Sequence, residues 1–215
     1  MNHIKTLILR ISAATSAALV VCAPAVLPMP AAAQTQSEVD RAIAAVRAIS
    51  TMQASFTQTD ANGRRATGTL TMRRPGRIRF QYAPGIPLLI VSDGAALTFV
   101  DYETRQVQRW PIKNSPLGAL LDPSRDVMKY GRLIGSDHRQ VVSVEVRDKA
   151  RPEYGVITLV FTRKAGAPGG LELSSWAALD SQKRRTIVTL SNQQYGLAVP
   201  DNAFRYNDPR APVRR

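Results

Sequence analysis

Short segments that alternate apolar and polar residues with a period of two run through most of this 215-residue chain. Turn-forming pairs such as Asn62-Gly63, Pro84-Gly85 and Asp93-Gly94 separate these segments. Because sequential strands joined by short turns pair antiparallel, the pattern predicts a mainly β domain built as a meander. The clearest predicted strands are one that starts at residue 51 and those at 67–74, 77–82, 88–92, 96–101, 106–110, 140–148, 155–163, 171–179 and 184–191.

Two regions carry helical patterns instead. Apolar residues recur at three- and four-residue spacing from Val39 to Ile49, and Ser37 with Asp40 forms a weak capping pair, which predicts an amphipathic helix starting near Ser37. Ser115-Pro116 resembles a helix start and predicts a short helix pair that extends to Lys129. The strands could form a closed barrel filled by its own side chains, or a curved sheet with helices over a cavity; the pattern alone leaves both open.

The N-terminus has the features of a secretory signal. Lys5 and Arg10 precede a small and apolar stretch, and Ala31-Ala32-Ala33 supplies the small residues that signal peptidase needs. We therefore expect residues 1–33 to be a cleaved signal peptide and residues 34–215 to form a single domain that is released, soluble, into the periplasm. An acylated Cys22 is the alternative, but Val21 stands where a lipobox has a small residue.

Cleavage would leave a mature chain without cysteine, because Cys22 is the only one in the sequence. Such a chain suits the periplasm better than a disulfide-stapled extracellular setting. Loss of Lys5 and Arg10 with the signal lowers the formal charge from +13 to +11. A charge of this sign favours contact with acidic surfaces, either anionic headgroups or an acidic partner protein.

The sequence offers little for catalysis. His138 is the only histidine beyond the expected signal, which argues against a Ser-His-Asp site, a Cys-His site or a zinc or copper centre. Asp122 and Asp126 read best as cap and surface residues. We therefore expect no enzyme and no cofactor. Export also argues against nucleic acid as the partner of the arginines between Arg64 and Arg79 or of Lys183 to Arg185.

One arginine stands out by its position in a strand. Leu70, Met72 and Arg74 point to the same face of the 67–74 strand, which is otherwise apolar, and Pro75 ends that strand. Alternation alone leaves two interpretations open. Arg74 either curls back to solvent at the strand end or serves a function inside the domain.

Several ordered motifs are similar to those of the LolA family of periplasmic lipoprotein carriers. The similarity extends over nearly the whole mature chain, with its specific motifs before residue 122 and at the C-terminal end. These motifs are Ala54-Ser55-Phe56-Thr57-Gln58, Gly68 with Arg74-Pro75, Arg79 to Pro84, Val91-Ser92-Asp93-Gly94, Gln106-Val107, Ser115-Pro116-Leu117, and Pro200 with Phe204.

The resemblance implies an open, incompletely closed antiparallel β-barrel with a helical lid around an apolar cavity. It implies that Arg74 latches the lid by hydrogen bonds to lid carbonyls. It also implies that a monomer carries the acyl chains of lipoproteins from an inner-membrane lipoprotein-releasing ABC transporter to an outer-membrane acceptor such as LolB. The alternative is a LolA-like binder or sensor of another lipid or hydrophobic ligand.

Strand alternation then selects residues for this cavity, each of which could also be ordinary core. Thr98 and Val100, where the family often has aromatics, should face outward and bear on outer-face packing or a partner surface. The expected cavity lining is Leu70, Met72, Ile78, Phe80, Tyr82, Leu89, Val91, Leu97 and Phe99, with Ile43, Val46, Leu117, Leu120 and Leu121 packing from the lid helices.

Overall fold

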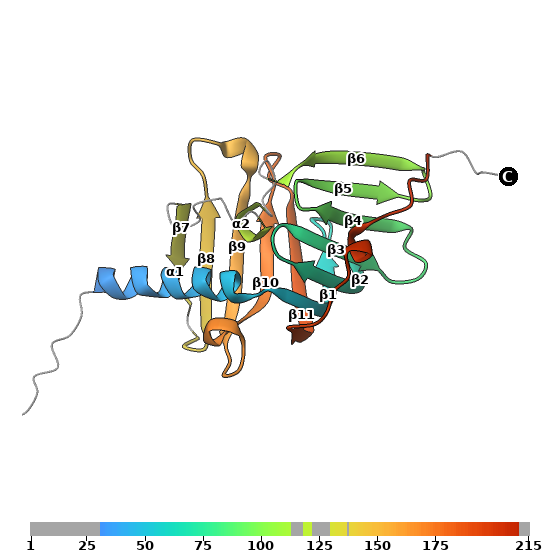
Figure 1. The fold of residues 1–215 in the computed structure, drawn as a ribbon. Coiled ribbons are helices and arrows are strands. Elements are labelled where there is room, and N and C mark those ends of the chain that lie inside the picture. The colour runs from blue at the N-terminus through green and yellow to red at the C-terminus, as the bar shows by residue number, and fades with distance from the viewer. Residues whose placement is uncertain (1–30, 113–117, 122–129, 137, 211–215) are drawn as a thin grey trace, which may run out of the picture.

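The fold is one curved, eleven-stranded antiparallel sheet with a long helix across its concave side (Figure 1). The computed structural model describes residues 31–112, 118–121, 130–136 and 138–210, without the side chains of 31–37, 119 and 120. The strands are β1 (Thr51–Thr59), β2 (Arg65–Arg73), β3 (Arg77–Tyr82), β4 (Leu88–Asp93), β5 (Ala96–Asp101), β6 (Gln106–Pro111), β7 (Gly131–Ile134), β8 (Val141–Arg147), β9 (Val156–Arg163), β10 (Leu171–Leu179) and β11 (Arg185–Tyr195).

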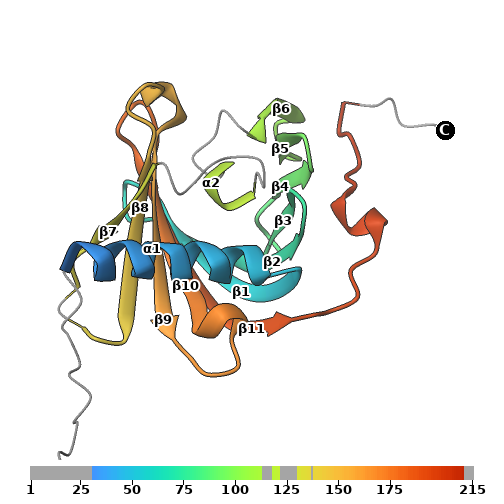
Figure 2. The same ribbon diagram turned by 60° about the vertical axis from the view of Figure 1, so that its left-hand side comes forward.

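Two meanders make up the sheet, and the pairing of β1 with β11 joins them. The strand order is β6-β5-β4-β3-β2-β1-β11-β10-β9-β8-β7, so β6 and β7 form its two edges. The barrel is therefore open, as expected, and Figure 2 shows its two halves facing each other. The strands predicted at 77–82, 96–101 and 171–179 are confirmed at both ends, whereas the four-residue β7 was missed because it is too short to show alternation.

The long helix begins earlier than its capping signal suggested. α1 spans Ala31–Ala48, so Ser37 lies inside the helix and does not cap it. The expected signal cleavage after Ala33 would fall in its first turn. α2 covers Gly118–Leu121, and the rest of the predicted helix pair lies outside the described residues.

α1 lies across β7, β8 and β10 and against a 3-10 turn, η3 (Pro168–Gly170) (Figure 2). Gly169 makes this contact possible. A Cβ atom at that position would lie 2.9 Å from the Cα atom of Ala45 in α1, and the φ angle of Gly169 is 66°. Glu38 of α1 pairs with Arg163 of β9 at 2.6 Å. The sheet thus fixes both the middle of the helix and its last turns.

The C-terminal segment covers the outer face of the first meander (Figures 1 and 2). Arg73 and Arg77 both bind the carboxylate of Asp201, at the start of the 3-10 turn η4 (Asp201–Phe204). Arg79 donates hydrogen bonds to the carbonyl oxygens of Ala203 and Arg205, at 3.3 and 2.9 Å. Part of the basic run from Arg64 to Arg79 therefore holds the chain's own C-terminal segment.

The contact of Asp201 with two arginines should depend on pH. Hydrogen bonds from Arg73 and Arg77 lower the pKa of this carboxyl below its ordinary value of 3.8. The contact is therefore fully present above pH 3.8 and is lost as the pH falls through the lower folded-state pKa. We expect the NMR signals of the Phe204 ring to titrate with a midpoint below 3.8 in the wild type and to lack this step in Asp201→Asn. A midpoint at or above 3.8 would contradict this contact.

Candidate ligand cavity and its lid

The concave face of the sheet is apolar and closed over. Strand register places Leu70 opposite Phe80 and Met72 opposite Ile78, so these side chains form rows across β2 and β3. Of the predicted lining residues, six belong to this buried cluster and are at most 4% exposed: Leu70, Met72, Ile78, Phe80, Tyr82 and Leu97. Because this surface is buried, a ligand can reach it only if a covering element moves.

Leu89 and Val91 do not lie on this face, and the expectation that they line the cavity is wrong. Leu89 pairs with Gln81 and Val91 with Arg79, which places both on the outer face. There they pack with Val100 and Phe204 beneath the C-terminal segment. The run 88–91 is apolar throughout because both of its faces are covered, so alternation could not show which residues point inward.

Ile90, which lies between Leu89 and Val91 in β4, is on the concave face instead. Ile90 lies opposite Phe80 on the concave side, and Phe99 lies opposite Ile90, so Phe99 is on the expected face but only half-buried. Val100 is on the outer face, as expected, and is fully buried there.

The sequence-based lining was also incomplete, because the second meander supplies as much of the concave face as the first. Phe161, Leu173 and Trp176 are buried in the same cluster. Alternation in β9 would have found Phe161. In β10, an irregularity in pairing between Leu173 and Ser175 shifts the alternation before Trp176 and hides that residue.

Edge-to-face aromatic contacts connect the strands beneath the lid. Phe56 meets Phe80 at 5.3 Å and Tyr82 at 5.2 Å between ring centroids, and Phe80 meets Trp176 at 6.1 Å. Tyr82 donates from its hydroxyl to Oε1 of Gln58 at 2.8 Å. Burial raises the pKa of Tyr82 to about 12, so its hydroxyl stays protonated and neutral. The concave face is therefore uncharged at this end.

Three of the residues predicted for the lid helices can be placed. Ile43 and Val46 of α1 and Leu121 of α2 are buried in the concave cluster. α2 lies between the two halves of the barrel (Figure 2). Leu117 and the side chain of Leu120 fall outside the described part of the chain. These placements make α1 and α2 the two described helices that cover the concave face.

Arg74 connects the end of β2 to the last turns of α1. Its Nε and Nη2 atoms both donate to the carbonyl oxygen of Val46, at 3.1 and 2.8 Å, and its backbone N–H donates to Ser50 at 2.9 Å. The Val46 carbonyl also accepts a hydrogen bond from the backbone N–H of Ile49 at 3.3 Å, and carbonyls in the last turn of a helix carry partial negative charge that favours a cation. Burial, together with the nearby charge of Arg47, lowers the pKa of Arg74 from 12.5. Its guanidinium remains charged at neutral pH and points inward to the lid rather than to solvent.

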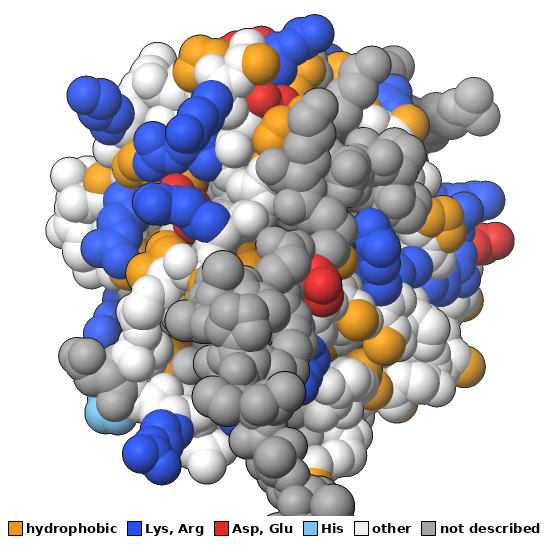
Figure 3. Space-filling view, turned by 90° about the vertical axis from the view of Figure 1, so that its left-hand side faces the viewer, with side chains coloured by type: hydrophobic (Ala, Val, Ile, Leu, Met, Phe, Trp, Pro, Cys, Tyr) orange, Lys and Arg blue, Asp and Glu red, His pale blue; other side chains and the backbone are white. Residues whose placement is uncertain are grey.

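The surface around α1 and β7 is strongly basic. Figure 3 shows many Lys and Arg side chains on this face and few Asp or Glu. Among the described residues, no three His, Cys, Asp or Glu side chains gather as a metal site would require. His138 is exposed in a loop, and Asp122 and Asp126 lie outside the described residues. None of the described helices is long and apolar enough to span a membrane.

Together, these observations define an open antiparallel barrel with an apolar concave face and an arginine-held helix across it. Residues 47–207 match the profile of the family described as outer membrane lipoprotein carrier protein LolA. The chain belongs to the LolA family.

Two carrier proteins from other bacteria agree with this assignment. An outer-membrane lipoprotein carrier protein of Xanthomonas campestris is 27% identical over 179 residues, covering 74% of this chain and 79% of its own length. That of Legionella pneumophila is 28% identical over 177 residues, covering 77% and 83%. Among solved structures, the LolA superfamily protein NE2245 of Nitrosomonas europaea matches with a TM-score of 0.44 and 11% identity, covering 80% of this chain and 97% of that one. The names of the family and of these relatives support a lipoprotein-carrier role at the level of the family, which agrees with a non-enzymatic protein.

Proposed function

We propose that this protein binds the acyl chains of lipoproteins on its concave face and shuttles them through the periplasm from the inner to the outer membrane. The observation that carries this proposal is the pair of hydrogen bonds from Arg74 to the Val46 carbonyl, which fixes α1 over the buried apolar concave face. In this proposal the donor is the inner-membrane lipoprotein-releasing ABC transporter. The acceptor is an outer-membrane protein such as LolB.

The energetics suit a reversible carrier. A hydrogen bond to a charged group contributes about 1.5–3 kcal/mol. Burying one methylene contributes about 0.8 kcal/mol, so roughly four to eight methylenes of an acyl chain offset the two bonds from Arg74 to the Val46 carbonyl. Cargo can therefore displace the lid, and the lid can reclaim its place once the cargo has a better environment.

The same proposal includes a cleaved signal peptide at residues 1–33 and a monomeric mature chain of residues 34–215. The small residues Ala31 to Ala33 before Gln34 support the cleavage site. The basic face around α1 and β7 supports an acidic docking partner (Figure 3).

Mass spectrometry of the native protein purified from the periplasm tests the cargo and the N-terminus together. A mature chain that starts near Gln34 and carries a triacylated lipoprotein is the expected result. Another lipid in its place would overturn the lipoprotein assignment and leave a LolA-like binder of a different ligand. An acylated Cys22 would overturn the proposed release from the membrane.

A reversible crosslink tests whether α1 must move for loading. The Cβ of Ala45 and a Cβ built on Gly169 would be 3.1 Å apart, slightly closer than the roughly 3.8 Å typical of disulfides. Because the same Cβ would lie 2.9 Å from the Cα of Ala45, Ala45→Cys with Gly169→Cys should crosslink once α1 shifts slightly away from η3. The oxidised variant should fail to take up a fluorescent triacylated lipopeptide, and reduction should restore uptake.

The two single variants serve as controls for the crosslink, because each carries one of the changes without the bond. Both should load the lipopeptide with or without reductant. Uptake by the oxidised double variant at the wild-type rate would show that α1 is not the lid.

A further inference from the structure

We infer that Ser92 is a positioning residue for Arg74, because it holds the turn that contains this arginine where the guanidinium can reach the Val46 carbonyl of the lid. The inference rests on the proposed latch and adds a residue that does not itself touch the lid. Ser92 is fully buried near the end of β4. It lies between Ile78 of β3 and Leu97 of β5 in the concave-face row. A hydroxyl buried in an apolar row costs free energy unless its hydrogen bonds are made.

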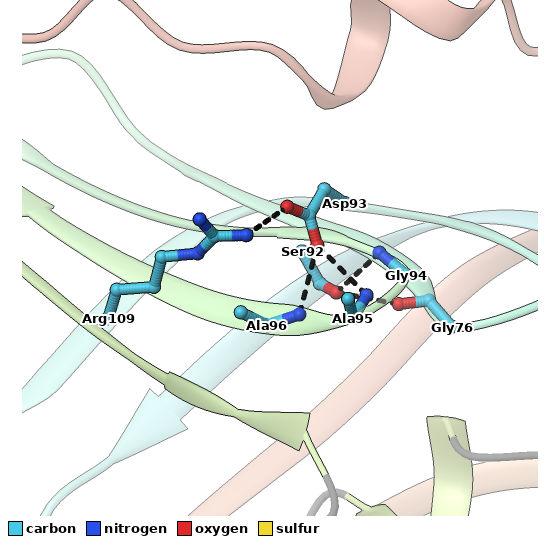
Figure 4. Close-up of polar contacts among 7 residues, drawn as sticks. All are labelled: Gly76, Ser92, Asp93, Gly94, Ala95, Ala96 and Arg109. Atoms are coloured by element: carbon cyan, nitrogen blue, oxygen red, sulfur yellow. Dashed lines mark hydrogen bonds and ion pairs between the residues drawn. The ribbon is translucent and has the colours of Figure 1, made fainter.

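The hydroxyl of Ser92 connects two turns that follow different strands. Its Oγ donates to the carbonyl oxygen of Gly76 at 2.7 Å and accepts from the backbone N–H of Gly94 at 3.1 Å (Figure 4). Gly76 belongs to the 74–76 turn between β2 and β3, and Gly94 belongs to the turn between β4 and β5. One side chain therefore ties the turn that follows Arg74 to a neighbouring hairpin.

The two turns approach each other backbone to backbone. A Cβ atom on Gly76 would lie 2.8 Å from the carbonyl oxygen of Gly94, and one on Gly94 would lie 3.5 Å from the oxygen of Pro75. No side chain at Gly76 could keep this spacing without a shift. The 74–76 turn thus packs directly against the backbone of the second turn, the one between β4 and β5.

The second turn is itself held by hydrogen bonds and an ion pair, which allows it to act as a support. Asp93 accepts hydrogen bonds at 2.9 Å from the backbone N–H groups of Ala95 and Ala96 and pairs with Arg109 of β6 (Figure 4). Burial alone would raise the pKa of Asp93, but these two N–H groups and the Arg109 charge lower it overall, which keeps the carboxylate ionised at neutral pH.

Position matters because the bonds of Arg74 to Val46 are sensitive to distance. They span 2.8 and 3.1 Å, so a backbone displacement of about 1 Å would take them out of hydrogen-bonding range. On the other side of Arg74, its own N–H is fixed to Ser50 at 2.9 Å. Ser92 supplies the second anchor, beyond Pro75.

Ser92→Ala is the direct test, with Ser174→Ala as its matched control. Ser174 also bonds through its hydroxyl, to Thr162 at 2.6 Å, but lies on β10 away from both turns. Hydrogen exchange of the amides from residue 39 to residue 50 should accelerate about three- to tenfold in Ser92→Ala, the size expected for one lost hydrogen bond. It should not change in Ser174→Ala. Transfer of a fluorescent triacylated lipopeptide to phospholipid vesicles should slow by a similar factor, and Ser92→Thr, which retains the hydroxyl, should restore it.

A double variant separates this inference from the latch itself. If Ser92 acts through Arg74, adding Ser92→Ala to Arg74→Leu should leave the transfer rate of Arg74→Leu unchanged. Additive slowing in the double variant, or equal exchange in Ser92→Ala and Ser174→Ala, would overturn the role of Ser92 while the latch stands. A wild-type transfer rate in Arg74→Leu would instead overturn the latch.

Discussion

Arg74→Leu should take up a triacylated lipopeptide as completely as the wild type but pass it to acceptor vesicles about tenfold or more slowly. In the closed form, Arg74 donates two hydrogen bonds to the Val46 carbonyl, and these favour closure of α1 over the concave face. Each contributes about 1.5–3 kcal/mol, and a change of about 1.4 kcal/mol is already tenfold in an equilibrium. Leucine removes this competitor to cargo and adds apolar surface beside it. Stopped-flow fluorescence of the transferred lipopeptide measures the rate.

Two variants serve as controls, one for the charge at position 74 and one for the loss of an arginine elsewhere on the surface. Arg74→Lys keeps the charge but loses the two-pronged donor geometry, so it should fall between the wild type and Arg74→Leu. Arg65→Leu removes an exposed arginine at the start of β2, on the outer face, and should transfer at the wild-type rate. Unaltered transfer by Arg74→Leu would refute a latch and leave Arg74 as a structural tie between β2 and α1.

Arg73 and Arg74, at and just after the end of β2, make contacts on opposite faces of the sheet. Arg73 points outward, where it binds Asp201 and lies 5.4 Å from the ring centroid of Phe204. Arg74 points inward to Val46. Strand alternation predicts this division, since consecutive side chains leave a sheet on opposite sides, although β2 itself ends at Arg73 and Arg74 begins the turn. Alternation therefore marked Arg74 as a candidate for the inner face, and its hydrogen bonds to Val46 decide between the two interpretations that the sequence left open.

Other features depended on contacts between distant segments and could not be predicted from local pattern. Leu89 and Val91 belong to a strand that is apolar on both faces, and only the distant Phe204 shows which side each one occupies. Arg77 and Arg79 read as a free basic surface until the C-terminal segment is placed over them. The start of α1 was misjudged because Ser37 has the chemistry of a cap but the helix continues past it to Ala31.

Ser92 shows the same limit in the candidate site. Its motif, Val91-Ser92-Asp93-Gly94, predicts a turn, and that turn is present. The local pattern does not show that the serine hydroxyl reaches back across the sheet to Gly76, sixteen residues earlier. Turn chemistry is a local property, whereas the contact between two turns requires the register of β3 against β4.

Gly68→Ala should be the most destabilising single-methyl change in the barrel. Gly68 lies between Phe56 of β1 and Tyr82 of β3 in the concave row. An added Cβ would overlap the carbonyl oxygen of Gln81 and would lie 2.7 Å from Cε1 of Phe56. Because backbone cannot rotate away as a side chain can, we expect a loss of about 3 kcal/mol in the free energy of unfolding, at the upper end for overpacking. For a domain of this size that corresponds to roughly 6–12 °C in Tm by calorimetry.

Two comparisons decide whether the backbone contact causes this loss. Gly135→Ala adds the same methyl where nothing lies within 4 Å and no unusual φ is required, so it should change stability by less than about 0.5 kcal/mol. Phe56→Leu combined with Gly68→Ala relieves the ring contact but not the contact with Gln81. It should therefore fail to restore stability. Recovery in that double variant would locate the constraint in the aromatic cluster, and Gly68 would then serve to seat the Phe56 ring rather than to keep β2 and β3 in register.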